Sequence, residues 1–516
     1  MSVFALLALF VGAVSGPRPA PIQTVALSPT AGAMATVKLA FRAGSIDDPP
    51  DRAGLTALAA ELLVRGGTAA HPGESMERAL YPLGARIEVQ VDREQTVFTA
   101  RAPREVIFEV AGWMAEEVAH PRLDAAQLAA TREDAKDSLR ATRDDDEALA
   151  SEALVALLYP NHPYAHPPVG TAAGLDAIGS RRDELDPMRS SVAVGRPLPQ
   201  TKRVRGLDEV RAQLARILTR DRLTLGLAGA YPRELAAALT EKLAALPEHG
   251  APVAALPVPA GRTRALLAER NTDTTTIAVG LAWNVHRGDP DFVPLLVGIS
   301  ALGEHRQFSG RLFESLRNRR GLNYGDYAYA ERFVQDGAST FPAPHVSLRQ
   351  QYFSLALRPV ANANRVFALR AALHVVRELV ANGITEGELA RTRSFLIGAT
   401  RLWAQTDERQ LGWAIDGAFY GDADYLAHLR ASLENVTADQ VNAALRRHLD
   451  PNRLRIVMVG ANARELAREL EANAATTRQK LPRVGLESED AEIAREPLGL
   501  AAEDVAVVDA ESLFAR

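Results

Sequence analysis

Cysteine is absent from all 516 residues of the chain. The protein therefore has no disulfide framework, no thiolate metal ligand and no cysteine nucleophile, and this absence fits any compartment. Histidine is also scarce, with 11 in the chain and none between Ala53 and Ala70. His162 and His166 are four residues apart, but each is followed by proline, which breaks the helix that would align them on a metal and predicts a turn.

Long apolar runs and an excess of basic charge are missing as well. Beyond the N-terminal residues, no segment has the roughly 20 uncharged apolar residues of a membrane span, so none is expected in the mature chain. The formal net charge of −5 gives no basic field to collect phosphates and argues against a nucleic-acid partner. A composition of 47% hydrophobic and 24% charged residues is typical of a globular protein.

The N-terminus carries an apolar run from Val3 to Val14, followed by small residues and a Pro-rich stretch. Its length is that of a signal-peptide core, although it lacks Lys or Arg before the run. Two interpretations stay open, an apolar N-terminal strand and a signal peptide over residues 1–16. We carry the second forward, and it implies a periplasmic or secreted protein.

Two halves of the chain show the same order of elements, which predicts an internal repeat. Each half ends in a similar strand, Arg222–Ala230 in the first and Arg453–Ala461 in the second. Each also contains a helix start of the same kind, at Asp124 and at Thr385, followed three residues later by Gln or Glu as in a capping box.

These landmarks divide the chain into five parts. The first half covers 25–250 and contains a basic, Pro-containing insertion at 179–204, which we interpret as a surface loop. A Pro-rich linker at 251–262 leads to the second half, 263–460, and an acidic tail follows at 461–516. Whether the tail packs back or stays loose is not decided by the sequence.

Alternation of apolar and polar residues predicts half-buried antiparallel strands. The pattern occurs at Val37–Arg42 and Ile87–Asp92, and corresponding strands are expected at Thr276–Trp283 and Tyr352–Leu357. A long helix is predicted through Val366 to Leu379 in the second half. The fold class is therefore α+β, with antiparallel sheets flanked by helices in each half.

A second predicted helix lies at Gly54–Thr68 and has two different faces. One face carries the spacing of a core-facing stripe, with the residues Leu55, Leu58, Ala59, Leu62 and Leu63. The opposite face carries Ala57, Ala60, Glu61 and Val64, and its small apolar residues suggest that it is still covered by protein.

Gly54–Thr68 resembles the catalytic helix of the insulinase-like (M16) metallopeptidases, which reads Gly-Leu-x-His-x-x-Glu-His. In that family the two histidines bind zinc and the glutamate is the general base. The three positions here are Ala57, Ala60 and Glu61, and a methyl group can neither bind a metal nor accept a proton. A one-residue shift makes Glu61 the motif glutamate but turns the histidine positions into Leu58 and Leu62.

The third zinc ligand of the family, a glutamate on a later helix, falls near Asp137. Glu61 and Asp137 would supply two carboxylates and no nitrogen, which suits a hard cation loosely and zinc poorly. The other interpretation is two solvated acids on helix surfaces. We therefore expect no metal or cofactor in this chain, and zinc only in a partner subunit.

A second resemblance covers Gly310–Tyr324, which looks like the M16 segment whose Arg and Tyr, seven residues apart, face the zinc. Arg317 and Tyr324 have that spacing. By resemblance, the arginine holds a substrate carbonyl or carboxylate and the tyrosine hydroxyl stabilises the oxyanion. The alternative is an Arg cluster that ends a helix at Gly321, followed by a core strand Tyr324–Tyr329.

The resemblance implies two homologous halves in a clam-shell around a central cavity. Some processing peptidases of the family divide the zinc helix and the Arg/Tyr segment between two chains. The leading hypothesis is a subunit, inactive alone, that pairs as a heterodimer with a homologue carrying His-x-x-Glu-His and binds peptide or unfolded protein. The alternatives are a stand-alone peptide-binding or assembly scaffold, and an active metallopeptidase with unrecognised ligands.

Overall fold

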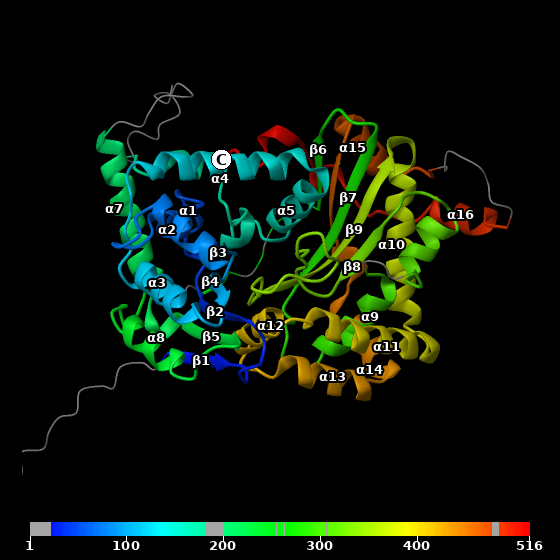
Figure 1. The fold of residues 1–516 in the computed structure, drawn as a ribbon. Coiled ribbons are helices and arrows are strands. Elements are labelled where there is room, and N and C mark those ends of the chain that lie inside the picture. Colours follow the sequence, from blue (N-terminus) through cyan, green and yellow to red (C-terminus); the bar gives the residue numbers. More distant parts are fainter. Residues whose placement is uncertain are drawn as a thin grey trace, which may run out of the picture.

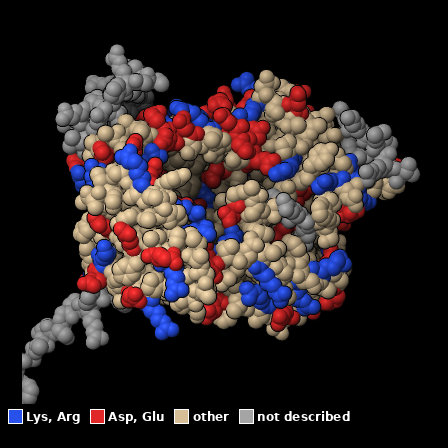
Figure 2. All heavy atoms as spheres, in the orientation of Figure 1, with Lys and Arg blue, Asp and Glu red and all other residues tan. Residues whose placement is uncertain are grey.

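The computed structural model describes residues 22–180, 200–253, 255–257, 259, 261, 264–304, 308–476 and 485–516, without the side chains of 200–204. The predicted signal peptide, 1–16, and most of the predicted insertion, 179–204, lie outside the described residues. The chain forms two halves side by side, each a sheet with helices around it (Figure 1). Figure 2 shows the surface hollowed between the halves, where the resemblance implied a central cavity.

Each half contains one mixed sheet, and the two sheets repeat the same strand order. The first is β1-β5-β2-β4-β3, and the second is β6-β10-β7-β9-β8 with β11 added outside β6. The strands of the first are β1 Gln23–Ala26, β2 Met34–Phe41, β3 Arg86–Val91, β4 Thr96–Pro103 and β5 Leu223–Gly229. Those of the second are β6 Ala265–Glu269, β7 Thr274–Trp283, β8 Asp326–Tyr329, β9 Gln351–Ala361, β10 Arg455–Gly460 and β11 Val505–Asp509.

The helices follow the repeat as well. The first half has α1 Leu55–Gly66, α2 Glu74–Leu80, α3 Ile107–Ala119, α4 Gln127–Asp144, α5 Asp146–Leu158, α6 Ala172–Ala177, α7 Gln200–Ile217 and α8 Leu235–Leu243. The second has α9 Phe292–Leu302, α10 Arg365–Asn382, α11 Glu386–Trp403, α12 Asp407–Phe419, α13 Tyr425–Asn435, α14 Ala438–His448, α15 Ala463–Ala472 and α16 Glu487–Ile493. The predicted two-half α+β fold is confirmed.

The sheets differ from the sequence prediction in two respects. They are mixed, because β1 pairs with β5 and β6 pairs with β10 in parallel. In each half the last strand returns beside the first after several helices, and such a crossover allows parallel pairing. The strand that corresponds to β3 is β8, whereas β9 corresponds to β4, a strand whose weaker alternation we did not recognise.

Residues 461–516, described above as an acidic tail, are largely folded onto the second half. β11 pairs with β6 in parallel and extends the second sheet. Ile493, Leu498 and Leu500 are buried in the core of that half. The apolar side chains between the acidic residues therefore anchor this segment to the sheet.

The two halves exchange helices. α5 belongs to the first half but packs on β7 and β10 of the second sheet, and α12 of the second half packs on β5 and β1 of the first. Leu154 and Leu158 of α5 belong to one apolar cluster, and Leu411 and Ile415 of α12 belong to another. Separating the halves would expose both clusters, so the exchange holds the halves together.

A polar turn between β3 and β4 adds a second connection between the halves. Asp92 forms an ion pair with Arg332, and Glu94 with Arg349, both across the boundary. Gln95 donates to Asp416 of α12 at 3.2 Å. Because Asp92, Glu94, Gln95 and Asp416 are all buried, these contacts are shielded from water.

Candidate functional site

The degenerate helix α1 is well formed. Gly54 adopts a φ of 99° before its first residue, and Asp48 accepts hydrogen bonds from the backbone N–H groups of Gly54 and Thr56, at 2.7 and 2.8 Å. Burial raises the pKa of Asp48 to about 7, although the hydrogen bonds from Thr56 and Gly54 oppose that shift. At the other end, Gly66 lies so close to the carbonyl of Arg122 that a Cβ would sit 1.8 Å from its oxygen.

Both faces of α1 can now be compared with the prediction. All five residues of the predicted core stripe are buried. On the opposite face Ala60 is 0% exposed, Ala57 and Val64 are half-buried, and Glu61 is exposed. The face that carries the ligands in active relatives is therefore only partly covered.

The neighbouring helix α4 supplies Asp134 rather than Asp137 to this region. Arg65 of α1 forms a 2.6 Å ion pair with Asp134, while Asp137 pairs with Arg140 on its own helix. Desolvation raises the pKa of Glu61, with Arg65 lowering it and Asp134 raising it again. The structure thus brings an arginine, and not a pair of acids alone, to the position beside Glu61.

These residues do not fit a zinc ion. At the two positions where the family has nitrogen ligands, Ala57 offers no donor atom and Glu61 offers only carboxylate oxygens, and Ala60 cannot act as the general base. Within the described ranges, no group of three or more His, Asp or Glu side chains is arranged to hold a metal. His162 is 4% exposed and accepts a hydrogen bond from the Tyr164 N–H, so it belongs to the predicted turn.

Arg317 and Tyr324 lie together, as their spacing predicted. Arg317 is part of a π-helical turn, Phe313–Asn318, and its guanidinium lies 4.9 Å from the Phe313 ring centroid and 5.7 Å from that of Tyr324. It also donates to the Tyr324 carbonyl at 3.3 Å. Tyr324 is 82% exposed and precedes β8, which begins at Asp326, so it is not part of a core strand.

The Arg317 segment is fixed at the outer side of the second half. Arg319 forms an ion pair of 2.5 Å with Glu489 of α16, and Arg320 pairs with Glu489 and Asp490 at 2.9 and 2.8 Å. In Figure 1, α16 and α1 lie at opposite sides of the molecule. Within this chain, the Arg/Tyr segment therefore lies well apart from the degenerate helix α1.

Two family patterns match this chain. Residues 24–172 match the insulinase family, peptidase family M16, and residues 206–396 match the peptidase M16 inactive domain. The chain belongs to peptidase family M16. The first match contains the helix with Ala57 and Ala60, so this M16 member lacks the histidines and the glutamate of the zinc motif.

Similar proteins cover most of the M16 chain. An uncharacterized zinc protease of Mycobacterium bovis is 23% identical over 436 residues, 83% of this chain and 89% of its own length. A peptidase M16 inactive domain structure from Pseudomonas fluorescens has a TM-score of 0.69 at 22% identity, covering 86% of this chain and 96% of its own. A chain of Complex III2 from Candida albicans has a TM-score of 0.67 at 14% identity, covering 86% and 96%. The structural likeness supports the fold.

Proposed function

We propose that this M16 protein is a non-catalytic subunit that binds extended peptides or unfolded protein and complements a homologue carrying the His-x-x-Glu-His helix. The observation that carries the proposal is the combination of a helix without zinc ligands and an accessible Arg317/Tyr324 pair. In a divided site, this chain would supply the groups that stabilise charge while its partner supplies the metal.

The chemistry of the pair supports such a role. A guanidinium can hold a carbonyl or carboxylate through two N–H groups, and a phenol can donate to an oxyanion. Tyr324 at 82% exposure leaves most of its ring in water, which is unfavourable for so large an apolar surface unless a partner or substrate covers it. Placement far from α1 is expected if the site to be completed belongs to another chain.

Peptide binding is supported by the edge of the first sheet. Among the described strands β3 pairs with β4 alone, so its outer edge has backbone groups free to receive an extended chain. Its side chains alternate between exposed and half-buried from Arg86 to Val91, which leaves shallow apolar positions beside that edge. Addition of a peptide strand here would place it next to α1.

A stand-alone binding or assembly scaffold is the second candidate. The helix exchange and the buried turn Asp92–Gln95 favour it, since they join the halves firmly. The likeness in fold to a chain of Complex III2 is in keeping with this role.

The N-terminal sequence supports a further proposal, export to the periplasm or medium, which N-terminal sequencing of the mature protein would test. None of the helices in the described residues is long and apolar enough to cross a membrane.

The deciding experiment is cleavage of a quenched fluorescent peptide by the purified chain, by a His-x-x-Glu-His homologue, and by both together. Arg317→Ala and Tyr324→Phe test the pair, and Arg401→Ala serves as a control because that exposed arginine lies in the last turn of α11. We expect cleavage in the mixture only, with a loss of about 100-fold for either site variant, the size of an oxyanion-hole deletion.

Equal cleavage by the homologue with and without this chain would reject the complementing role. If the chain still bound the peptide in fluorescence anisotropy, the scaffold function would stand. Cleavage by this chain alone that a chelator abolishes would reject both functions, because it would require metal ligands other than the family positions.

A further inference from the structure

The face of the second sheet that is turned toward α5 has a step in it. Two rows of paired residues cross this face from β8 through β9 to β7: Tyr327, Ala356 and Ala278, and then Tyr329, Ser354 and Gly280. In each row a tyrosine on β8 is followed by two small residues. Because side chains at paired positions share one face, the sheet surface is high along β8 and low along β9 and β7.

Helix α5 covers only part of the low strip. Leu154 of α5 lies against β7, where a Cβ at Gly280 would be 3.1 Å from its Cδ2 atom. Ala356 on β9 stays exposed. A pocket of about 160 Å³ lies in the remaining space, with α5 on one side and Tyr327 and Tyr329 on the other. The exchange of α5 between the halves therefore creates this pocket.

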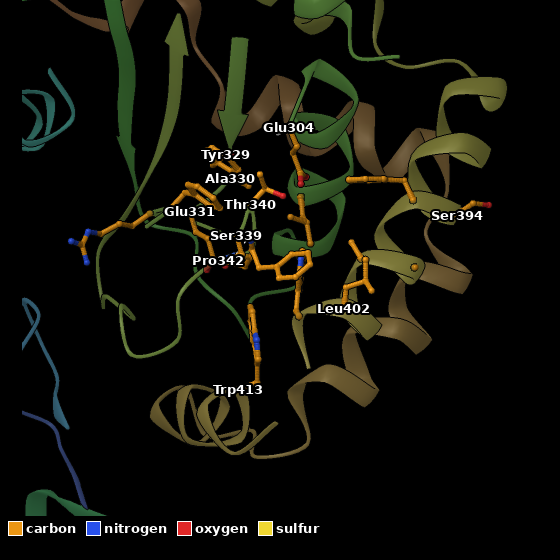
Figure 3. Close-up of a pocket in the computed structure, with 18 of the residues that line it drawn as sticks. Glu304, Tyr329, Ala330, Glu331, Ser339, Thr340, Pro342, Ser394, Leu402 and Trp413 are labelled. Carbon is orange, nitrogen blue, oxygen red and sulfur yellow. Dashed lines mark hydrogen bonds between the residues drawn. The ribbon is translucent and has the colours of Figure 1, made fainter. Parts of the chain in front are cut away.

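The size and the walls of the pocket suit one large side chain. Its volume is below the roughly 300 to 1,000 Å³ of pockets for small organic ligands. Phe333 also lines it and stacks on Tyr329 at 3.9 Å between ring centroids. These two residues line a larger cavity beside α11 as well, where Figure 3 labels Tyr329. Because the stack borders space in both directions, it can shift to admit a further ring, and contacts between rings add to the burial of apolar area.

The charged side chains that line the pocket compensate each other. Glu147 of α5 and Arg358 of β9 form an ion pair of 3.5 Å, and each side chain is 47% exposed. Arg358 also lies over the Tyr327 ring, at 5.8 Å from its centroid. A charged side chain would gain little from this neutral pair and would lose hydration against the apolar walls. The pocket therefore favours an uncharged ring.

The pocket lies between two parts of the proposed peptide-binding surface. β8 begins two residues after Tyr324, and Tyr327 of β8 lines the pocket. Arg332, the neighbour of Phe333 in the chain, forms an ion pair with Asp92, the residue that follows β3. A peptide strand on the edge of β3 that continues past Asp92 toward Tyr324 would therefore cross the pocket.

We propose that this pocket binds one aromatic side chain of the extended peptide, so that the protein selects peptides with Phe or Tyr at one position. The inference rests on the proposed peptide binding and adds a specificity to it. All the lining residues belong to this chain, so the selection requires neither zinc nor a partner subunit.

Fluorescence anisotropy of labelled peptides with the purified full chain tests the proposal. Three peptides share one host sequence of Ser and Thr and differ only at the central residue, which is Phe, Leu or Ala. We expect the Phe peptide to bind about tenfold or more tightly than the Ala peptide, with the Leu peptide between them, as for the burial of a large apolar side chain against rings.

Ala356→Leu fills the pocket from its floor and should bring the Phe peptide to the affinity of the Ala peptide. Ala361→Leu is the matched control and should keep the preference, because Ala361 is also exposed on β9 but does not line the pocket. Ser151→Phe, on the exposed side of α5, provides a second block should Ala356→Leu fail to fold.

Equal affinities for the three peptides would overturn the assignment of the pocket, whereas peptide binding, and with it the proposed function, would stand. A preference for Phe that persists in a folded Ala356→Leu or Ser151→Phe protein would overturn it as well. Binding of none of the peptides would overturn both this inference and peptide binding by the chain.

Discussion

Asp416 of α12 is a buried charge at the contact between the two halves. Its carboxylate accepts hydrogen bonds from the backbone N–H of His345, at 2.8 and 3.1 Å, and from Gln95 of the first half at 3.2 Å. Arg287 lies 4.0 Å away. Lys38 approaches the other side of the His345 ring, at 3.0 Å from Nε2, so the neutral ring accepts there and directs its Nδ1–H toward Asp416.

Replacing Asp416 by alanine should lower the free energy of unfolding by about 3 to 5 kcal/mol, the usual loss when one partner of a buried charged network is removed. Asp416→Asn keeps an acceptor for the His345 N–H but loses the charge, so we expect about 1 to 3 kcal/mol. Burial alone would raise the pKa of Asp416, but His345 and Arg287 more than offset this and hold it below its ordinary value. Its contribution is therefore complete at pH 7 and is lost as pH falls through the lowered pKa.

Urea denaturation followed by tryptophan fluorescence measures these values, with an unchanged m-value as the sign that only stability has changed. Asp137→Ala is the matched control, because Asp137 is an exposed helix acid whose removal should cost less than about 0.5 kcal/mol. A loss for Asp416→Ala no larger than that of the control would refute the assignment. A greater loss for Asp416→Asn than for Asp416→Ala would refute the role of the hydrogen bonds.

Three further predictions concern single side chains. Burial lowers the pKa of His345, so the native protein binds a proton there less readily than the unfolded chain, whose histidine takes up a proton below about pH 6.5. The free energy of unfolding, measured by urea titration at each pH, should therefore fall from pH 7 to 5, and it should fall less steeply in His345→Asn. Gly280→Ala should cost about 1 to 3 kcal/mol in the same assay, because the added Cβ lies 2.8 Å from the Phe353 carbonyl oxygen. Gly226→Ala should cost less, because it meets only side-chain ends. Glu388→Gln should lower the free energy of unfolding by about 1 to 2 kcal/mol at pH 7 and by little near pH 2. Burial alone would raise the pKa of Glu388, but hydrogen bonds from Arg311 and Thr385 hold it at about 2, so its contribution to stability is lost as pH falls from about 4.5.

Each of these predictions has a contrary outcome. An unchanged pH slope in His345→Asn would show that other groups carry the acid sensitivity. Equal losses of stability for Gly280→Ala and Gly226→Ala would mean that the α12 side chains around Gly226 yield no more readily than the β7–β9 backbone around Gly280. A pH-independent cost for Glu388→Gln would show that the carboxylate acts through shape rather than charge.

The repeat and the two faces of α1 could be predicted because each follows from local spacing. The core stripe and the capping box at Thr385 depend only on residues within one helix, and both are present in the structure. At the other predicted helix start, Asp124 accepts a hydrogen bond from the N–H of Ala126. Helix α4 begins only at Gln127, so Asp124 is not its N-cap residue. The exchange of α5 and α12 could not be predicted, because the apolar pattern of a helix does not specify which of the two sheets the helix covers.

A cavity of about 620 Å³ beside α11 was not recognised for a different reason. Phe395, Ala399 and Leu402 have the spacing of an ordinary apolar helix stripe, and Gly398 is a helix-destabilising residue within it. The residues that complete the cavity come from α9 and from the segment after β8, far away in the sequence. Only the three-dimensional repeat shows that this stripe occupies the place of the acidic face of α4.

The separation of the two faces of α1 explains why loss of the zinc motif left the fold intact. The core face of α1 is separate from the face that carries Ala57 and Glu61, so the ligands could be lost without disturbing the core stripe. Ala60 is the exception, because at 0% exposure it now contributes to packing, and a carboxylate there would have to be buried. Arg65 meanwhile holds Asp134 at 2.6 Å, which engages the nearby acid of α4 in a structural ion pair. The region around Ala60 and Asp134 is therefore held as packed structure.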